Sequence, residues 1–201
     1  MDRSRPPPYP VNRVTIDLMK SSRLLLPLLL WLFIPASAWS QGIEFEKLES
    51  TLVGGIYLLD ARIKYNFNDE ILEALEHGVS LRIDIIIRIK KVRKWLWNKK
   101  IREDVINFKL ERHPLSNHYL VSNLNSGNRY QLQTLNEALT ILGAIKNYKL
   151  IKADDLEKNA KYTGDIMAKL NIESLPPPLR PVAYASEQWQ LKSSLRKWVI
   201  K

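Results

Sequence analysis

Two segments between residues 57 and 89 alternate apolar and polar side chains with a period of two. In residues 57–67 every odd position is apolar or small, and the even positions from Asp60 onward are polar. The same period returns in residues 79–89, where Val79, Leu81 and four isoleucines alternate with mainly polar residues. A period of two places one face of a strand against a core and the other in water. We therefore expect two strands here, each with one buried face.

A short helix is predicted between these strands. Asn68 is a typical N-cap, and the acidic pair at positions 69 and 70 suits the positive end of a helix dipole. His77 and Gly78 end a helix in the usual way. The side chains expected to face the core are those of Ile71, Leu72 and Leu75.

The rest of the chain predicts further strands, turns and one more helix. Strands are expected over residues 105–112, 118–122, 130–132, 162–173 and 195–200, with turns at 113–117 and 125–128. Thr134 and Glu137 form a capping box, which opens a helix whose core-facing residues are Leu135, Ala138, Leu139, Leu142 and Ile145.

Two segments are expected to lack regular structure. Residues 41–50 are acidic and are expected to begin as a loose segment, before Gly54 and Gly55 turn the chain into its first strand. Residues 175–179 contain three consecutive prolines, which indicates an extended connection or a sheet edge.

About six or seven strands joined by short turns, with two short helices, indicate a mainly β (α+β) fold. We predict an antiparallel, sandwich-like arrangement in a single domain over residues 41–201. The alternative is a single antiparallel sheet covered by the two helices.

The first forty residues predict an export signal rather than part of the fold. Met19 opens a short basic lead, and residues 24–36 are an apolar run followed by small residues that suit signal-peptidase cleavage. A run of 13 residues is short of the roughly 20 that span a bilayer, which favours cleavage over a retained anchor. The polar residues 1–18 are unusual before a signal, so Met19 is the expected start. The predicted location is periplasmic, with membrane association as an option.

The chain has no cysteine, although an exported protein meets conditions that permit disulfides. Burial alone must then stabilise the domain, and a thiolate zinc site is excluded. No metal or other cofactor is expected.

The positive charge is concentrated in one segment. Residues 1–40 carry five basic and two acidic side chains, which leaves 26 basic and 19 acidic side chains in residues 41–201, a net charge of +7. Residues 79–102 hold nine basic residues and one acidic residue, a net charge of +8, so the rest of residues 41–201 sums to −1. A local excess of this kind indicates an anionic partner. Export makes nucleic acid an unsuitable partner.

The candidate binding residues lie in this segment. If the strand period continues past residue 89, Trp95 and Trp97 share a face flanked by cations. Indole rings suit the interfacial layer of a membrane, and cations suit phosphate or carboxylate. The alternative is that both indoles cap the core while the charges solvate a long hairpin. The full candidate set is Arg88, Lys90, Lys91, Arg93, Lys94, Trp95, Trp97, Lys99, Lys100 and Arg102.

The remaining motifs do not indicate a metal site or a catalytic site. His113 and His118 face each other across a predicted turn, but no cysteine or nearby carboxylate completes a metal site. Asp154 and Asp155 are adjacent in a loop, where neighbouring side chains point apart. No nucleophile elbow, phosphate loop or activated cysteine occurs, so no catalytic residue is proposed.

The order of these pieces resembles a proteobacterial family catalogued as domain of unknown function 4390, over nearly all of residues 55–198. The matching pieces are Tyr57, Tyr65 and Phe67; residues 73–75 and 77–79; Arg93, Trp95 and Trp97; residues 114–115 and 119–122; residues 135–139; residues 175–176 and 178–179; and residues 189–193. The resemblance implies a small periplasmic or envelope protein of Gram-negative bacteria, of the kind described as proline-rich signal-peptide proteins. It also implies a gene near a membrane-bound, nitrogen-type sensor kinase, and it supplies no catalytic residues. Residues 1–18 depart from the family pattern.

We therefore expect an exported, non-enzymatic binding or modulator domain. Its expected partner is an acidic envelope protein, such as the periplasmic region of a sensor kinase, or an anionic membrane surface. One alternative is an envelope enzyme of unrecognised type, which needs a cleft that gathers carboxylates or His113 and His118. A lipid carrier is a further alternative, and it needs an apolar pocket between the sheets.

Overall fold

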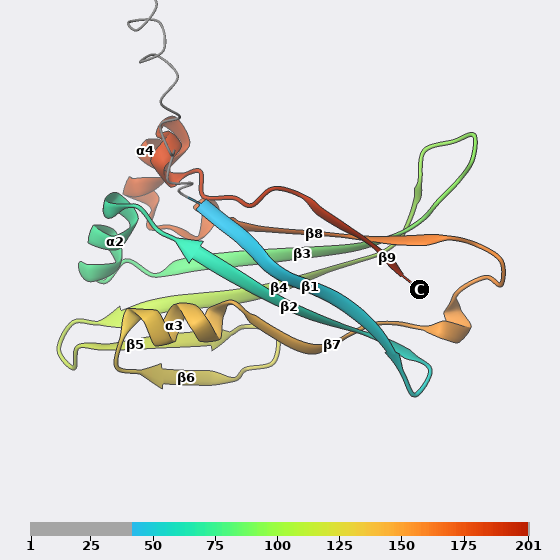
Figure 1. Ribbon diagram of the computed structural model, residues 1–201. Coiled ribbons are helices and arrows are strands. Elements are labelled where there is room, and N and C mark those ends of the chain that lie inside the picture. The colour runs from blue at the N-terminus through green and yellow to red at the C-terminus, as the bar shows by residue number, and fades with distance from the viewer. Residues whose placement is uncertain (1–41, 201) are drawn as a thin grey trace, which may run out of the picture. The chain divides into compact units, whose positions relative to one another are not determined.

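Nine β-strands and three short α-helices make up residues 42–200, which are the residues that the computed structural model describes (Figure 1). The export signal and the start at Met19 lie outside the described residues. The strands are β1 (Gly42–Val53), β2 (Ile56–Asn66), β3 (Leu81–Lys91), β4 (Lys99–His113), β5 (His118–Asn123), β6 (Arg129–Leu132), β7 (Ala144–Lys152), β8 (Tyr162–Leu170) and β9 (Arg196–Ile200). The helices are α2 (Asp69–Glu76), α3 (Leu135–Leu142) and α4 (Arg180–Ala185).

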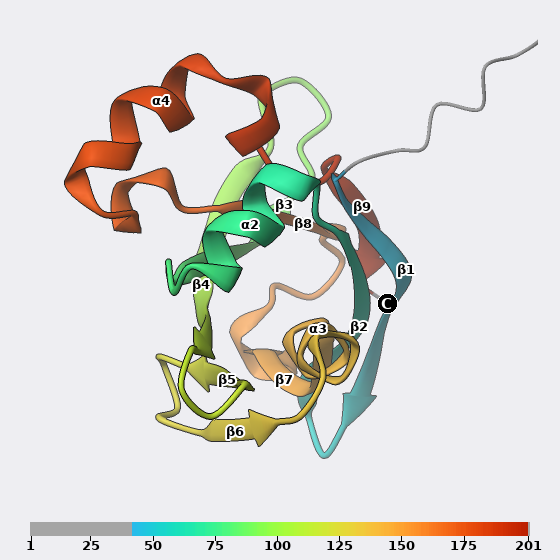
Figure 2. The same cartoon turned by 90° about the vertical axis from the view of Figure 1, so that its left-hand side faces the viewer.

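The strands form two antiparallel sheets, which confirms the predicted sandwich-like fold. One sheet has three strands in the order β1-β2-β7, and the other has six in the order β6-β5-β4-β3-β8-β9. Figure 2 shows the two sheets facing each other, with α3 in contact with β2 of one sheet and β5 of the other. The alternative of a single sheet covered by helices is therefore wrong.

Strand β3 lies in the middle of the larger sheet and supplies much of the core. Its inward side chains at positions 81, 83, 85, 87 and 89 are each at most 1% exposed, as the alternating pattern predicts. Ile83 and Ile85 face apolar partners on both neighbouring strands; Ile85, for example, is paired with Ile106 on β4 and with Ala168 on β8. The hydrophobic run thus fixes the register of the sheet, because a shift by one residue would expose the whole row.

Strand β1 corrects the expectation of a loose acidic segment. Gly42–Val53 pairs antiparallel with β2 along its whole length. Only Ile43 and Phe45 of this strand bury apolar side chains, and a bulge after Phe45 shifts the alternation. The strand is held by its ladder with β2 and by the Gly54–Gly55 hairpin turn, in which both residues have positive φ. The polar sequence of this strand reflects the exposure of its side chains and gives no sign of its backbone pairing with β2.

Strand β7 was also missed, because the predicted helix was extended too far. Helix α3 ends at Leu142, so Ile145 belongs to β7 rather than to the helical face. Gly143 makes this change of structure possible. Its carbonyl accepts a hydrogen bond from the Ile63 amide, and a Cβ on it would lie 2.0 Å from the Ile63 carbonyl oxygen. Register shifts between β2 and β7 hide the two-residue period.

The two predicted helix starts are confirmed. The Asn68 side chain accepts a hydrogen bond from the Ile71 amide at 2.9 Å, and Thr134 and Glu137 form the reciprocal capping box. The proline run differs from its prediction. Residues 177–179 form a single 3-10 turn that leads into α4, because proline suits the first turn of a helix.

Candidate binding surface on the β3–β4 hairpin

The ten predicted site residues fall on one hairpin, but they do not form one continuous strand face. Pairing between β3 and β4 ends at Lys91 and Lys99, and residues 92–98 form a loop. Figure 1 shows this loop extending beyond the ends of both sheets. The idea that the strand period runs on through Trp95 and Trp97 is therefore wrong. The bulge after Ile89 already breaks the regular pairing before the loop begins.

The loop exposes three consecutive large apolar side chains. Trp95 and Trp97 are each 94% exposed, and Leu96 is 67% exposed. The alternative in which the indoles cap the core is therefore wrong. Scattered single apolar residues are normal on a protein surface, whereas three adjacent ones on a projecting loop make the loop a candidate contact surface.

Five of the predicted cations are paired with acids of the same domain. Arg88 Nε lies 2.7 Å from Glu103 Oε2, and Lys100 Nζ lies 3.2 Å from the same oxygen. Arg102 Nε lies 2.9 Å from Asp104 Oδ2. Two other lysines reach acids outside the hairpin, with Lys90 bonded to Asp165 and Lys91 to Glu157. These five side chains are therefore engaged in ion pairs within the domain.

The neighbouring cations lower the pKa of two of these acids, Glu103 and Glu157. The pKa of Glu103 lies below its ordinary value of 4.5, chiefly because Arg88 donates a hydrogen bond to it and next because Lys100 does. The pKa of Glu157 is lowered mainly by its hydrogen bond with Lys91, and further by the charges of Lys99 and Arg93. Both carboxylates therefore stay ionised and offset part of the local positive charge.

Three of the eight predicted cations form no ion pair within residues 42–200. They are Arg93, Lys94 and Lys99, and all three are exposed. Within the loop, the Arg93 amide donates to Asn98 Oδ1 at 3.4 Å. Together with Trp95, Leu96 and Trp97, these three cations are called the basic–aromatic tip below. The tip is half of the predicted site, with Leu96 added.

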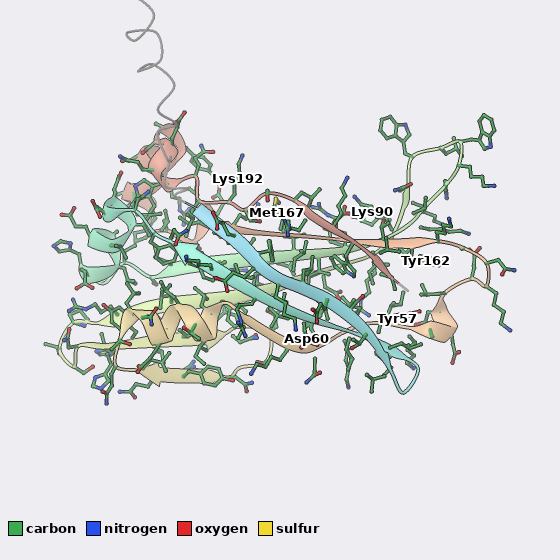
Figure 3. All side chains as sticks on the ribbon, viewed as in Figure 1. Tyr57, Asp60, Lys90, Tyr162, Met167 and Lys192 are labelled. Atoms are coloured by element: carbon green, nitrogen blue, oxygen red, sulfur yellow. The ribbon has the colours of Figure 1, made fainter. Side chains whose placement is uncertain are left out.

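Tertiary structure brings two more lysines toward this region. The Val92 amide donates to the Lys161 carbonyl at 2.8 Å, so the connection between β7 and β8 runs beside the base of the hairpin. Lys158 and Lys161 in that connection are exposed and form no ion pair within residues 42–200. Figure 3 labels Lys90 and Tyr162 at this base. No sequence signal pointed to these lysines, because about 65 positions separate them from the loop.

The fold does not assemble the other residues singled out in the sequence into a metal site or an acid–base pair. His113 and His118 are paired across neighbouring strands, and His118 Nδ1 lies 2.5 Å from the Ser116 carbonyl oxygen. Within residues 42–200 no group of three or more histidines or acids is arranged to hold a metal. Asp154 and Asp155 lie exposed on a 3-10 turn, Ala153–Asp155.

A cleft of about 320 Å³ lies where β8 runs into the segment before β9. Its lining includes Lys169, Lys192 and Trp189, whose Nε1 donates to Glu70 Oε1 at 2.5 Å. The one acid in its lining is Glu173, which accepts a hydrogen bond from the Tyr184 hydroxyl. That bond is the main reason why the pKa of Tyr184 is raised. The cleft gathers neither a pair of carboxylates nor the two histidines that the enzyme alternative requires.

Comparisons with known proteins give the family but no functional relative. In the part of the chain that the structure describes, no helix is both long and apolar enough to cross a bilayer. No curated protein matches the chain, and no solved structure does. A family model does match, over residues 40–199, and this covers most of the chain. The chain therefore belongs to the family described as "Domain of unknown function (DUF4390)".

Proposed function

We propose that this domain is a non-enzymatic docking module of the cell envelope, which binds an anionic surface through the basic–aromatic tip. The surface is either an acidic envelope protein, such as the periplasmic part of a sensor kinase, or an anionic membrane. Export to the periplasm through the signal in the first forty residues is part of the same proposal.

One observation carries the proposal. Three exposed cations without ion pairs adjoin three exposed apolar side chains on a loop that projects from the domain. Charged groups on such a surface steer an oppositely charged partner, and aromatic side chains provide contact area once the partner arrives. The five other predicted cations of the hairpin, which lie on its strands, are already paired internally, so the tip is the part of the hairpin that is free to bind.

The proposal is tested with two triple variants that remove the same charge. The tip variant is Arg93→Gln, Lys94→Gln and Lys99→Gln. The control variant is Arg129→Gln, Lys146→Gln and Lys149→Gln, three exposed cations on β6 and β7 that form no ion pair within residues 42–200. Both variants are expected to fold like the wild type, because exposed and unpaired side chains contribute little to stability.

Each protein is presented with a detergent-solubilised envelope fraction and, separately, with vesicles that contain an anionic lipid. Wild type and control variant are expected to bind at least one of the two targets at about 50 mM salt, and to bind it much less at about 500 mM. The tip variant is expected to lose this binding. Equal behaviour of the tip and control variants toward both targets would overturn the proposal.

A further inference from the structure

We infer that the basic–aromatic tip is a membrane-insertion loop, which places Trp95, Leu96 and Trp97 in the interfacial layer of an anionic bilayer. The inference rests on the proposed function and chooses the lipid surface over the acidic protein. Four features of the hairpin carry it, namely the arrangement of its apolar side chains, its free charges, its support and its difference from other exposed loops.

The first feature is that three successive side chains are all exposed together. In a strand, neighbouring side chains alternate between two faces, so Leu96 would point away from the two indoles. Residues 94–96 form a bend instead of a strand, and exposures of 94%, 67% and 94% follow along Trp95, Leu96 and Trp97. A folded protein partner would need a pocket for each of these side chains. A lipid interface accepts all of them without a matching shape.

The side-chain types suit the lipid interface. Tryptophan concentrates where membrane hydrocarbon meets the headgroups, because its ring is apolar and its N–H needs a polar partner. Leucine between two indoles adds apolar area that only a lipid or another apolar surface can cover. Val92, at the start of the loop, is exposed as well.

The second feature is the sign and position of the free charges. Residues 92–98 contain no acid, and the nearby carboxylates at positions 103, 104, 157 and 165 are bonded to cations on the strands. Arg93, Lys94 and Lys99 are left to face lipid phosphates. Lys158 and Lys161 approach the same region from the β7–β8 connection. Each such cation near an anionic membrane strengthens binding by about fivefold.

The third feature is the support behind the loop. The two strands of the hairpin pair from Leu81 with Leu110 out to Lys91 with Lys99, and β3 is also paired with β8. The loop is therefore fixed at the end of a paired β-ladder and is not part of a flexible segment. A tip held in this way loses less conformational entropy on binding than a flexible segment does.

The fourth feature is the contrast with another exposed loop of the same domain. Leu115 is 97% exposed in the turn between β4 and β5, but residues 114–117 carry no Lys or Arg and no aromatic side chain. Figure 1 shows that turn at the opposite end of the strands from the basic–aromatic tip. Leu115 is thus a natural control position.

The test uses the full chain and exploits its lack of cysteine. Leu96→Cys and Leu115→Cys each provide one site for a polarity-sensitive fluorophore, so the readout reports the labelled loop whatever the rest of the chain does. The labelled proteins are mixed with vesicles of phosphatidylcholine alone, and with vesicles that also contain phosphatidylglycerol. A quencher attached to the lipid tails reports depth.

With anionic vesicles, the label at position 96 is expected to shift to the blue and to be quenched from the lipid tails, and the label at position 115 is not. Removing the three tip cations in the Leu96→Cys background should lower the apparent affinity for anionic vesicles about 100-fold, because each charge contributes about fivefold. Trp95→Ser with Trp97→Ser should abolish the quenching while leaving the net charge unchanged. Thermal unfolding of each variant verifies that the fold is intact.

The inference is overturned if position 96 shows no shift with anionic vesicles, if positions 96 and 115 respond alike, or if the double tryptophan variant is quenched as strongly as its parent. These failures are distinguishable from failure of the proposed function. Tip-dependent recovery of an acidic protein from the envelope fraction, without vesicle insertion, would retain the docking function and reject the lipid surface.

Discussion

Lys90 donates a hydrogen bond to Asp165, whose side chain is only 2% exposed although it lies on the outer face of the larger sheet. The pair links β3 to β8, and the Lys90 side chain is itself 27% exposed. Asp165 is thus a buried carboxylate that depends on a lysine at the base of the proposed binding hairpin. The lysine has a structural role even though its sequence context suggested only binding.

The first prediction follows from this dependence. Lys90→Ala is expected to lower the free energy of unfolding by about 1–3 kcal/mol, because it leaves a buried charged acceptor without its donor. Lys94→Ala, on the loop, should change it by less than about 0.5 kcal/mol. Chemical denaturation measures both values. If Asp165→Asn does not reduce the cost of Lys90→Ala in the double variant, the pair is not coupled as described.

A second prediction concerns Gly164 and Trp198. A Cβ on Gly164 would lie 2.1 Å from the indole of Trp198, so the ring rests directly on the glycine. Gly164→Ala is expected to destabilise the domain by about 1–3 kcal/mol through overpacking. In a Trp198→Ala background the space is open, and the same substitution should cost much less. An equal cost in both backgrounds, measured by thermal or chemical unfolding, would contradict the contact.

The third prediction compares two neighbouring isoleucines on β3. Ile85 is fully buried between the sheets, whereas Ile86 points to the outer face and is only half-buried. Ile85→Ala is expected to cost about 2–5 kcal/mol of unfolding free energy, and Ile86→Ala clearly less. Urea unfolding of the two variants gives the comparison. A reversed order would mean that the register of the sheet is shifted by one residue.

The fourth prediction is a pH dependence. Since the pKa of Glu103 is lowered in the fold by Arg88 and Lys100, its ionised form stabilises the domain. This contribution is fully present above the ordinary pKa of 4.5 and is lost as the pH falls through the lower folded value. Wild type should therefore be more stable than Glu103→Gln at neutral pH, and the difference should shrink toward zero below pH 4.5. A difference that is constant with pH would exclude this role for the carboxylate.

Local sequence signals predicted the elements whose stability is decided within a few residues or by strict alternation. The two-residue period located β3 and β8, and Asn68 and the Thr134 capping box located the starts of α2 and α3. These signals succeed because capping and side-chain alternation depend on neighbours in the chain. Strands β1 and β7 escaped prediction, since bulges interrupt their alternation and their pairing with β2 supplies the structure.

The candidate site also has one property that the sequence determines and another that only the tertiary structure determines. The sequence alone determined that cations and tryptophans are concentrated in one segment, because composition and order need no fold. Tertiary structure alone decided which of these groups are free. It paired Lys90 with Asp165 and Lys91 with Glu157, across more than 60 positions of the chain, and it left the basic–aromatic tip exposed. Ion pairs and exposure depend on which strands are neighbours in the fold. That arrangement is set by segments far apart in the chain, so no local pattern reveals it.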